Sequence, residues 1–139
     1  GSQTPEEILL KLNQAAGLLG VSGVSSDMRD LHDAADENPR ARLALDMFVN
    51  QAVKLVGAYY TEIGGADALV FAGGIGEKDD LIRQSIIDRL AVLGIKLDPQ
   101  LNKAEATGDL GTADSTARVL LIPTDEELAM AREVQRLIE

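Results

Sequence analysis

Glycine and charged residues gather at one point of the chain, directly after a short apolar run. Leu69, Val70 and Phe71 lead into the sequence Gly73-Gly74-Ile75-Gly76-Glu77-Lys78. The apolar run predicts a strand buried on both faces, and the glycines predict a tight turn into a helix. Such a turn presents main-chain N–H groups at the positive end of the helix dipole, where phosphate binds well. The run matches neither GxGxxG nor GxxxxGK[ST], so a turn that only lets the helix pack closely on the strand stays open as an alternative.

Two more turns carry charged side chains at predicted helix starts, Ser25-Ser26-Asp27-Met28-Arg29-Asp30 and Pro123-Thr124-Asp125-Glu126-Glu127. The second follows a predicted strand, and in a parallel sheet it would face the same crevice as the glycine turn. Glu126 is a candidate Mg²⁺ ligand, directly or through water, although an acid in a first helical turn is favourable without any ligand. Arg29 suits a phosphate or ribose group, and a surface ion pair with a neighbouring aspartate is the alternative.

Composition excludes several other kinds of site. The 139 residues carry a formal net charge of -10, which argues against nonspecific binding of nucleic acid. Cysteine is absent and His32 is the single histidine, so neither a disulfide framework nor a thiolate or histidine-rich metal site is expected. No Ser/His/Asp triad can be assembled. No apolar run approaches the roughly 20 residues of a membrane span, and the expected location is the cytoplasm. The pair Gly1-Ser2 is typical of a cloning remnant, which would make the chain a piece of a longer protein.

The first half of the chain is predicted to be helical. A capping box and a proline at Thr4-Pro5-Glu6-Glu7 begin a helix that should run to about Gly17. Residues 18–26 read as an extended connector, and a short helix with Ser25 or Ser26 as its cap should follow. The longest helix is predicted from Pro39 to Ile63, with apolar residues nearly all round. A subunit contact through this helix and a plain core helix are equally open.

The second half predicts an α/β arrangement. After the glycine turn a helix should span residues 79–93, followed by a short edge strand at residues 95–97 and a loop over residues 100–116. A second buried strand is expected at residues 118–123, and a capping box at residues 124–127 should start the last helix. A sheet of only three strands suggests that strands of the sheet are missing from this piece.

Four segments, taken in order, resemble the acetate kinase family over nearly the whole chain. They are Leu18 to Asp30, Phe71-Ala72-Gly73-Gly74-Ile75-Gly76-Glu77, Leu93-Gly94-Ile95-Lys96-Leu97-Asp98 and Ile122-Pro123-Thr124-Asp125-Glu126-Glu127-Leu128. Each segment alone is moderately specific, and the order and spacing of all four make the resemblance strong. This chain departs from the family pattern at Gly73, Lys78 and Asp125, and the departure at Lys78 puts the role of that side chain in doubt.

The resemblance implies a fold, a reaction and a set of site residues. The fold would be part of an actin-like ATPase (ribonuclease H-like) domain, with a small, mainly parallel sheet flanked by helices. The reaction would be transfer of the γ-phosphoryl of ATP to acetate with Mg²⁺, giving acetyl phosphate and ADP. Asp27, Met28 and Arg29 would line the adenosine side, and Glu126 would be associated with Mg²⁺. Main-chain groups near adenine and ribose would come from Gly74, Ile75, Gly76, Glu77 and Lys78.

The resemblance also sets what this chain would lack. Residues 1–139 would be the carboxy-terminal, nucleotide-binding part, without the family's catalytic groups around acetate and the transferred phosphoryl. We therefore expect no turnover from this piece alone, since phosphoryl transfer depends on such positioning and charge stabilisation. Propionate or butyrate kinase stays open, because the acyl pocket would lie mostly elsewhere. A non-catalytic folding or dimerisation module is the alternative of a different class, and the family's homodimer would form through the helix from Pro39 to Ile63.

Overall fold

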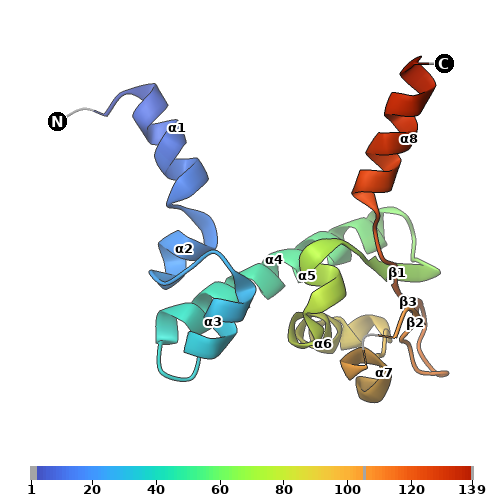
Figure 1. Ribbon diagram of the computed structural model, residues 1–139. Coiled ribbons are helices and arrows are strands. Elements are labelled where there is room, and N and C mark those ends of the chain that lie inside the picture. Colours follow the sequence, from blue (N-terminus) through green and yellow to red (C-terminus); the bar gives the residue numbers. More distant parts are fainter. Residues whose placement is uncertain (1–2, 105, 139) are drawn as a thin grey trace. The chain divides into compact units, whose positions relative to one another are not determined.

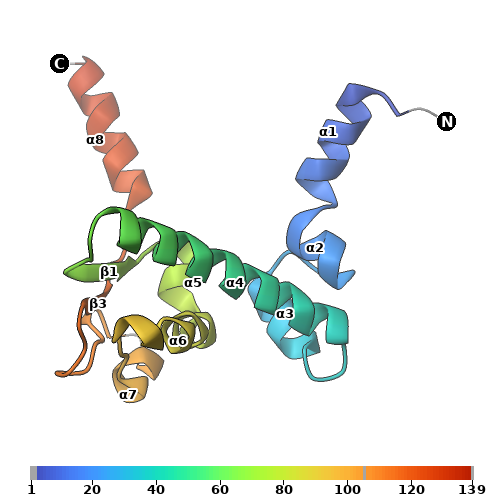
Figure 2. The ribbon, with the colours of Figure 1, turned by 180° about the vertical axis from the view of Figure 1, so that it is seen from behind.

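The computed structural model describes residues 3–104 and 106–138 and divides into two compact units. One unit extends to Gly65, and the other starts at Ala66. Figures 1 and 2 show the chain from opposite sides. Among the described residues, no helix is both long enough and apolar enough to cross a membrane.

The first unit consists of helices in its described part. These are α1 (Pro5–Gln14), α2 (Gly17–Ser22), α3 (Met28–Ala34) and α4 (Pro39–Glu62). The short helices α2 and α3 both pack on α4, and the buried core contains Leu31, Ala41, Ala44 and Val49. The start of α4 is well defined because the Asn38 side chain accepts hydrogen bonds from the N–H groups of Arg40 and Ala41, and Pro39 stands at its first position.

Helix α1 extends away from α2 (Figures 1 and 2) and buries none of its residues. Its predicted capping box is present, since the Thr4 hydroxyl accepts from the Glu7 N–H and the Glu7 carboxylate accepts from the Thr4 N–H. Large apolar side chains are exposed along it, namely Ile8, Leu9, Leu10 and Leu12. The capping box and Pro5 define where this helix begins, and none of its residues is buried against the rest of the described chain.

Two predictions for the first unit are wrong. The expected extended connector over residues 18–26 contains α2, which ends at Gly23 in the left-handed conformation with φ 69°. The cap of α3 is Asp27 instead of Ser25 or Ser26, because the Asp27 side chain accepts from the Arg29 N–H. The Ser25 hydroxyl instead accepts from the Asp27 N–H at 3.1 Å, one residue too early to cap the helix.

The second unit surrounds a three-stranded sheet in its described part. Its strands are β1 (Ala68–Phe71), β2 (Gly108–Asp109) and β3 (Arg118–Leu121), in the order β1-β3-β2. β1 and β3 are parallel, with Phe71 opposite Leu121, whereas β2 runs antiparallel to β3. Because β1 and β3 are parallel neighbours, their carboxyl ends meet at one edge of the sheet.

Helices follow both parallel strands. β1 leads into α5 (Gly73–Lys78) and α6 (Asp80–Arg89), and a 3₁₀ turn η1 (Ala91–Leu93) and α7 (Pro99–Lys103) come next. β3 leads into α8 (Glu126–Ile138), none of whose residues is buried. The buried apolar core comes from α6 and its C-cap, from the segment before α7, from the residue after β2 and from β3. Its large members are Ile82, Ile86, Ile87, Leu90, Ile95, Leu97, Leu110, Val119 and Leu121.

The helix predicted over residues 79–93 is present as α6 and η1. Gly94 ends it with φ 77°. A Cβ atom at Gly94 would lie 2.5 Å from Cγ2 of Thr116, so both the backbone angle and the close approach require glycine. This stop signal was read correctly from the sequence.

Other predictions for the second unit are corrected. The glycine turn is itself the short helix α5, and Val70 in the strand expected to be buried is 49% exposed. No strand forms at residues 95–97, where Leu97 makes only an isolated bridge with Gly111. The expected loop over residues 100–116 contains the strand β2 and all of α7 except its first residue.

A helix cap explains one of these differences, and another cap changes the predicted start of the last helix. Pro99 was taken as the end of a strand, but it begins α7 because the Asp98 side chain accepts from the N–H groups of Gln100 and Leu101. The cap of α8 is Asp125 instead of Thr124, since the Leu128 N–H donates to Oδ1 of Asp125 at 2.8 Å. Thr124 is occupied in a different contact, described below.

Candidate functional site

The carboxyl ends of β1 and β3 are joined by the side chain of Glu77. Its Oε1 accepts from the Gly73 N–H at 2.9 Å and from the N–H and hydroxyl of Thr124, both at 2.9 Å. One carboxylate oxygen thus holds the start of α5 and the segment that leads into α8. The hydrogen bonds from Thr124 are the main reason that the pKa of Glu77 lies below its ordinary value, and the Gly73 N–H adds to them.

This contact changes the interpretation of the glycine run as a phosphate seat. The first N–H of α5 was expected to face a ligand, but it donates to the Glu77 carboxylate. A negative charge already occupies the positive end of the short helix, and a phosphate at the same place would be repelled. The geometry therefore favours an uncharged ligand group near this end of α5.

The three glycines of α5 differ in what they require. Gly73 has φ 71°, a left-handed conformation that favours glycine. A Cβ at Gly76 would lie 3.4 Å from the carbonyl carbon of Phe71, so this glycine lets α5 approach β1 closely. Gly74 is different, because its φ is ordinary and a Cβ there would meet nothing within 4 Å. Neither the backbone angle nor crowding within the chain explains glycine at position 74.

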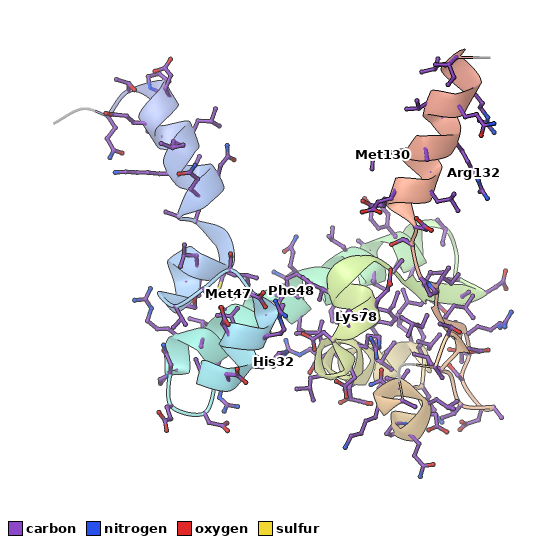
Figure 3. All side chains as sticks on the ribbon, in the orientation of Figure 1. His32, Met47, Phe48, Lys78, Met130 and Arg132 are labelled. Atoms are coloured by element: carbon purple, nitrogen blue, oxygen red, sulfur yellow. The ribbon has the colours of Figure 1, made fainter. Side chains whose placement is uncertain are left out.

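The remaining predicted residues of this unit lie close by in the sequence. Ile75 is half-buried in α5, and Lys78 is exposed at its last position (Figure 3). Glu126 is exposed in the first turn of α8, two residues after Thr124. Residues 3–104 and 106–138 contain no group of three or more His, Cys, Asp or Glu side chains suited to hold a metal ion.

Asp27, Met28 and Arg29 belong to the first unit. The side chains of Arg29 and Asp27 form a two-point pair, with Nη2 to Oδ2 at 2.7 Å and Nε to Oδ1 at 3.1 Å. The hydrogen bonds from Arg29 lower the pKa of Asp27 to about 2. The alternative of a surface ion pair for Arg29 is thus present, although its side chain is 88% exposed and accessible to a ligand. Met28 is only 6% exposed, so little of its side chain is accessible.

The turn before Asp27 is built by residues that the sequence analysis did not single out. Arg40 on α4 donates to the carbonyls of Val21 and Gly20 at 2.8 and 3.0 Å. The buried hydroxyl of Ser22 donates to the Ser25 carbonyl and accepts from the Val24 N–H. A serine and an arginine near a glycine have no recognisable spacing, so no local signal indicated these contacts.

Arg83 was also missed, and here a signal existed. It lies at i, i+3, i+4 and i+7 spacing with Ile86, Ile87 and Leu90, which places it on the apolar face of α6. Its side chain is fully buried and donates hydrogen bonds to α5 and to Asn102. An arginine on an apolar face is the pattern that would have indicated this buried contact.

A small sheet flanked by helices, with the ends of two parallel strands leading into α5 and α8, is the architecture of part of an actin-like ATPase fold. The family model described as the acetokinase family matches residues 1–132, and the chain belongs to this family. A curated relative, the acetate kinase of Lactiplantibacillus plantarum, is 51% identical over 136 residues, covering 97% of this chain and 34% of that protein.

Solved structures agree with this assignment. The acetate kinase of Porphyromonas gingivalis matches with a TM-score of 0.87 and 35% identity, over 99% of this chain and 35% of that one. A propionate kinase from Francisella tularensis matches with a TM-score of 0.85 and 38% identity, over 94% of this chain and 34% of that one. The chain spans about a third of the length of the relatives it matches.

Proposed function

We propose that this chain is the carboxy-terminal, nucleotide-binding part of an acetate kinase. The whole enzyme would transfer the γ-phosphoryl of ATP to a carboxylate oxygen of acetate, giving acetyl phosphate and ADP. The residues proposed to contact the nucleotide are residues 74–78 of the second unit and, as a separate set, Asp27, Met28 and Arg29 of the first. A reaction that uses ATP and acetate would place the protein in the cytoplasm.

Gly74 is the observation that carries this proposal. A glycine in a helix destabilises it by about 1 kcal/mol relative to alanine, and at this position the chain itself gives no reason to accept that loss. Gly57 in α4 has the same open space, and what distinguishes Gly74 is its place just after the carboxyl end of β1, where α/β folds bind their ligands. The open space beside Gly74 would therefore give room for a bound molecule. The Glu77 carboxylate at the start of α5 favours adenine or ribose there over phosphate.

Among the described acidic residues, Glu126 is the one that we propose as a ligand of Mg²⁺. Glu126 presents an exposed carboxylate, and Mg²⁺ commonly binds proteins through one or two carboxylates plus water and phosphate oxygens. Bound there, the ion would neutralise charge on the phosphates of the nucleotide. Asp125 is used as the cap of α8, which fixes the first turn that carries Glu126.

The chain alone should not turn over. Phosphoryl transfer needs charged groups placed around the transferred phosphoryl and the acceptor, and we expect these groups in the part of the family's length that this chain, about a third of it, does not cover. The same reasoning leaves the acceptor open among short carboxylates. Similarity to a propionate kinase keeps propionate, and by extension butyrate, as alternatives to acetate.

A second candidate function, dimerisation, is favoured by the surface of α4. Five of its large apolar residues or those at its end are 47–66% exposed, namely Leu43, Met47, Leu55, Tyr59 and Ile63; Met47 and the neighbouring Phe48 are labelled in Figure 3. An exposed apolar surface of this kind is suited to contact a second copy of the chain. This role is compatible with nucleotide binding, since the residues proposed for the two roles are different.

Calorimetric titration of Mg·ADP into the chain is the direct test. Gly74→Val should abolish or strongly weaken binding while the thermal midpoint stays close to that of the parent. Gly57→Val is the matched control, since a Cβ at Gly57 in α4 also meets nothing within 4 Å. Equal affinity in the Gly74→Val variant and the parent would count against α5 as the nucleotide site.

If the isolated chain binds no Mg·ADP, a transplant distinguishes an incomplete site from a purely structural module. The chain would replace the matching 136 residues of the Lactiplantibacillus plantarum acetate kinase. Formation of acetyl phosphate by this hybrid, and its loss in the Gly74→Val hybrid, would support the proposal. A folded hybrid without activity would contradict it.

A further inference from the structure

Helix α5 is too weak to hold its own shape. It has six residues, and three of them are glycines. Short helices in water are marginal even with good helix formers, and each glycine makes them weaker. If residues 74–78 bind a nucleotide, other parts of the chain must fix their main-chain groups. The two ends of α5 show how this is done.

The N-terminal end is held by Glu77, as described above. The C-terminal end is held by Arg83, whose Nη1 donates to the carbonyl of Gly76 at 2.8 Å and to that of Glu77 at 2.9 Å. Carbonyls at a helix end lack partners within the helix and carry partial negative charge, so a guanidinium is well suited to this place. Both ends of α5 are therefore held by side-chain hydrogen bonds, while no atom of the chain lies close to the position of a Cβ at Gly74.

Asn102 in turn holds Arg83. Nε and Nη2 of Arg83 donate to the side-chain and main-chain oxygens of Asn102 at 2.7 and 2.9 Å. The amide nitrogen of Asn102 donates to the Asp80 carbonyl at 2.9 Å, which ties α7 to the start of α6. Arg83 is 0% exposed and Asn102 is 3% exposed, so water does not compete for these bonds. The plane of the guanidinium is fixed from the side opposite α5.

Stability alone does not explain a buried arginine at this position. Apolar residues often replace a whole buried polar network with little loss of stability, and the neighbouring face of α6 is already apolar. Replacing Arg83 alone would instead leave the carbonyls of Gly76 and Glu77 and the oxygens of Asn102 without their donor. Arginine supplies what an apolar residue does not, namely directed hydrogen bonds that fix two successive carbonyls of α5. The position of α5 is the property that depends on it.

We propose that Arg83 and Asn102 are positioning residues for nucleotide binding, which hold α5 in the shape that residues 74–78 need. The proposal rests on the proposed nucleotide site. It assigns Arg83 no contact with the ligand, and its effect passes through the carbonyls of Gly76 and Glu77. Loss of this support should therefore weaken nucleotide binding more than it weakens the fold.

Amide hydrogen exchange of the chain without nucleotide tests the support itself. Arg83→Met, which keeps an apolar stem of similar length, should increase the exchange rates of α5 amides and of the Asp79 N–H, which donates to the Ile75 carbonyl. Asn102→Ala should act in the same direction. Ile95→Val is the control core variant, because Ile95 is buried in the same unit and takes no part in the hydrogen bonds of Arg83 and Asn102. Unchanged exchange of α5 amides in both Arg83→Met and Asn102→Ala would overturn the proposal.

Ligand affinity then separates positioning from general destabilisation. In the hybrid enzyme, Arg83→Met and Asn102→Ala should raise KM for ATP by about tenfold or more and leave KM for acetate nearly unchanged, whereas Ile95→Val should change neither. Arg83→Lys should recover part of the loss. If ATP and acetate are affected equally, the residues act only on the fold and the proposal fails. If neither the parent chain nor the hybrid uses nucleotide, the proposed function itself has failed. The hydrogen-exchange experiment is made without nucleotide, so its result tests the support of α5 independently of that failure.

Discussion

Oε1 of Glu77 accepts hydrogen bonds from both the main-chain N–H and the hydroxyl of Thr124, each at 2.9 Å. The two residues are 47 positions apart in the sequence, and each follows one of two parallel strands. This contact sets where α8 starts relative to α5, because Glu77 lies within α5 and Thr124 directly precedes the first turn of α8.

Removal of the Glu77 carboxylate should loosen both segments at once. In Glu77→Ala the N–H groups of Gly73 and Thr124 lose their acceptor, and we expect both amides to exchange faster with solvent while β1 and β3 keep their protection. Exchange measured by NMR checks this. Thr124→Val is the matched variant, because it keeps the Thr124 N–H and removes only the hydroxyl bond. It should therefore affect Thr124 far less than Glu77→Ala does. Equal exchange in Glu77→Ala and the parent would show that the contact does not hold these segments.

The hydrogen bonds between Glu77 and Thr124 should be lost in acid, and their contribution to stability should fall as the pH falls. The pKa of Glu77 is lowered in the folded chain by the hydrogen bonds from Thr124 and Gly73. Its stabilising contribution is therefore complete above the unfolded glutamate pKa of about 4.3 and is lost as the pH falls through the lower folded value. The chemical shift of the Thr124 amide should titrate with a midpoint below about pH 4.3.

Glu77→Gln serves as the control for this titration, since it cannot ionise and should remove the inflection. The Asp27 carboxylate provides a comparison within the same chain, because Arg29 lowers its pKa to about 2. Its signals should therefore titrate with a midpoint near pH 2. A midpoint for the Thr124 amide at or above the ordinary glutamate value would contradict the assigned hydrogen bonds.

Local start and stop signals in the sequence explain which helices and strands could be predicted. Asn38-Pro39 and Gly64-Gly65 bound the longest helix, and the structure begins and ends α4 at these points. Gly94 ends the helix that follows the glycine run, as predicted. The apolar run 118–122 contains β3. These signals are local, since they depend on caps, on proline and on left-handed glycine.

The features that were not predicted depend on contacts between distant segments, or on residues such as glycine that are typical of a turn but here lie in a helix. Glycines at positions 73, 74 and 76 predict a turn, whereas the segment is a short helix whose two ends are hydrogen-bonded to the side chains of Glu77 and Arg83. Strand β2 has two residues and exists through pairing with β3. The residues proposed for nucleotide binding came from the resemblance. The hydrogen bonds that hold α5 through Arg83 and Asn102 join residues 19 positions apart, which no motif records.

The adjacent glycines 73 and 74 should respond oppositely to alanine. Gly74→Ala adds a Cβ in open space at an ordinary φ, so we expect the free energy of unfolding to rise by up to about 1 kcal/mol through helix propensity. Gly73→Ala places a side chain at φ 71°, which should lower it by about 1–2 kcal/mol. Denaturant unfolding measures both. Two variants with the same sign of change would show that the backbone of α5 differs from that described.

The exposed apolar surface of α4 should mediate self-association of the chain. Leu55 and Tyr59 lie one turn apart and are 47% and 61% exposed. A charge introduced in an apolar contact must be buried without a partner, so Leu55→Glu should weaken the dimer by at least about tenfold. Sedimentation velocity over a concentration series measures this. Val92→Glu is the control, since Val92 is 89% exposed in η1 of the other unit and should leave association unchanged. If the parent chain sediments as a monomer at every concentration, or if both variants dissociate alike, α4 is not the contact.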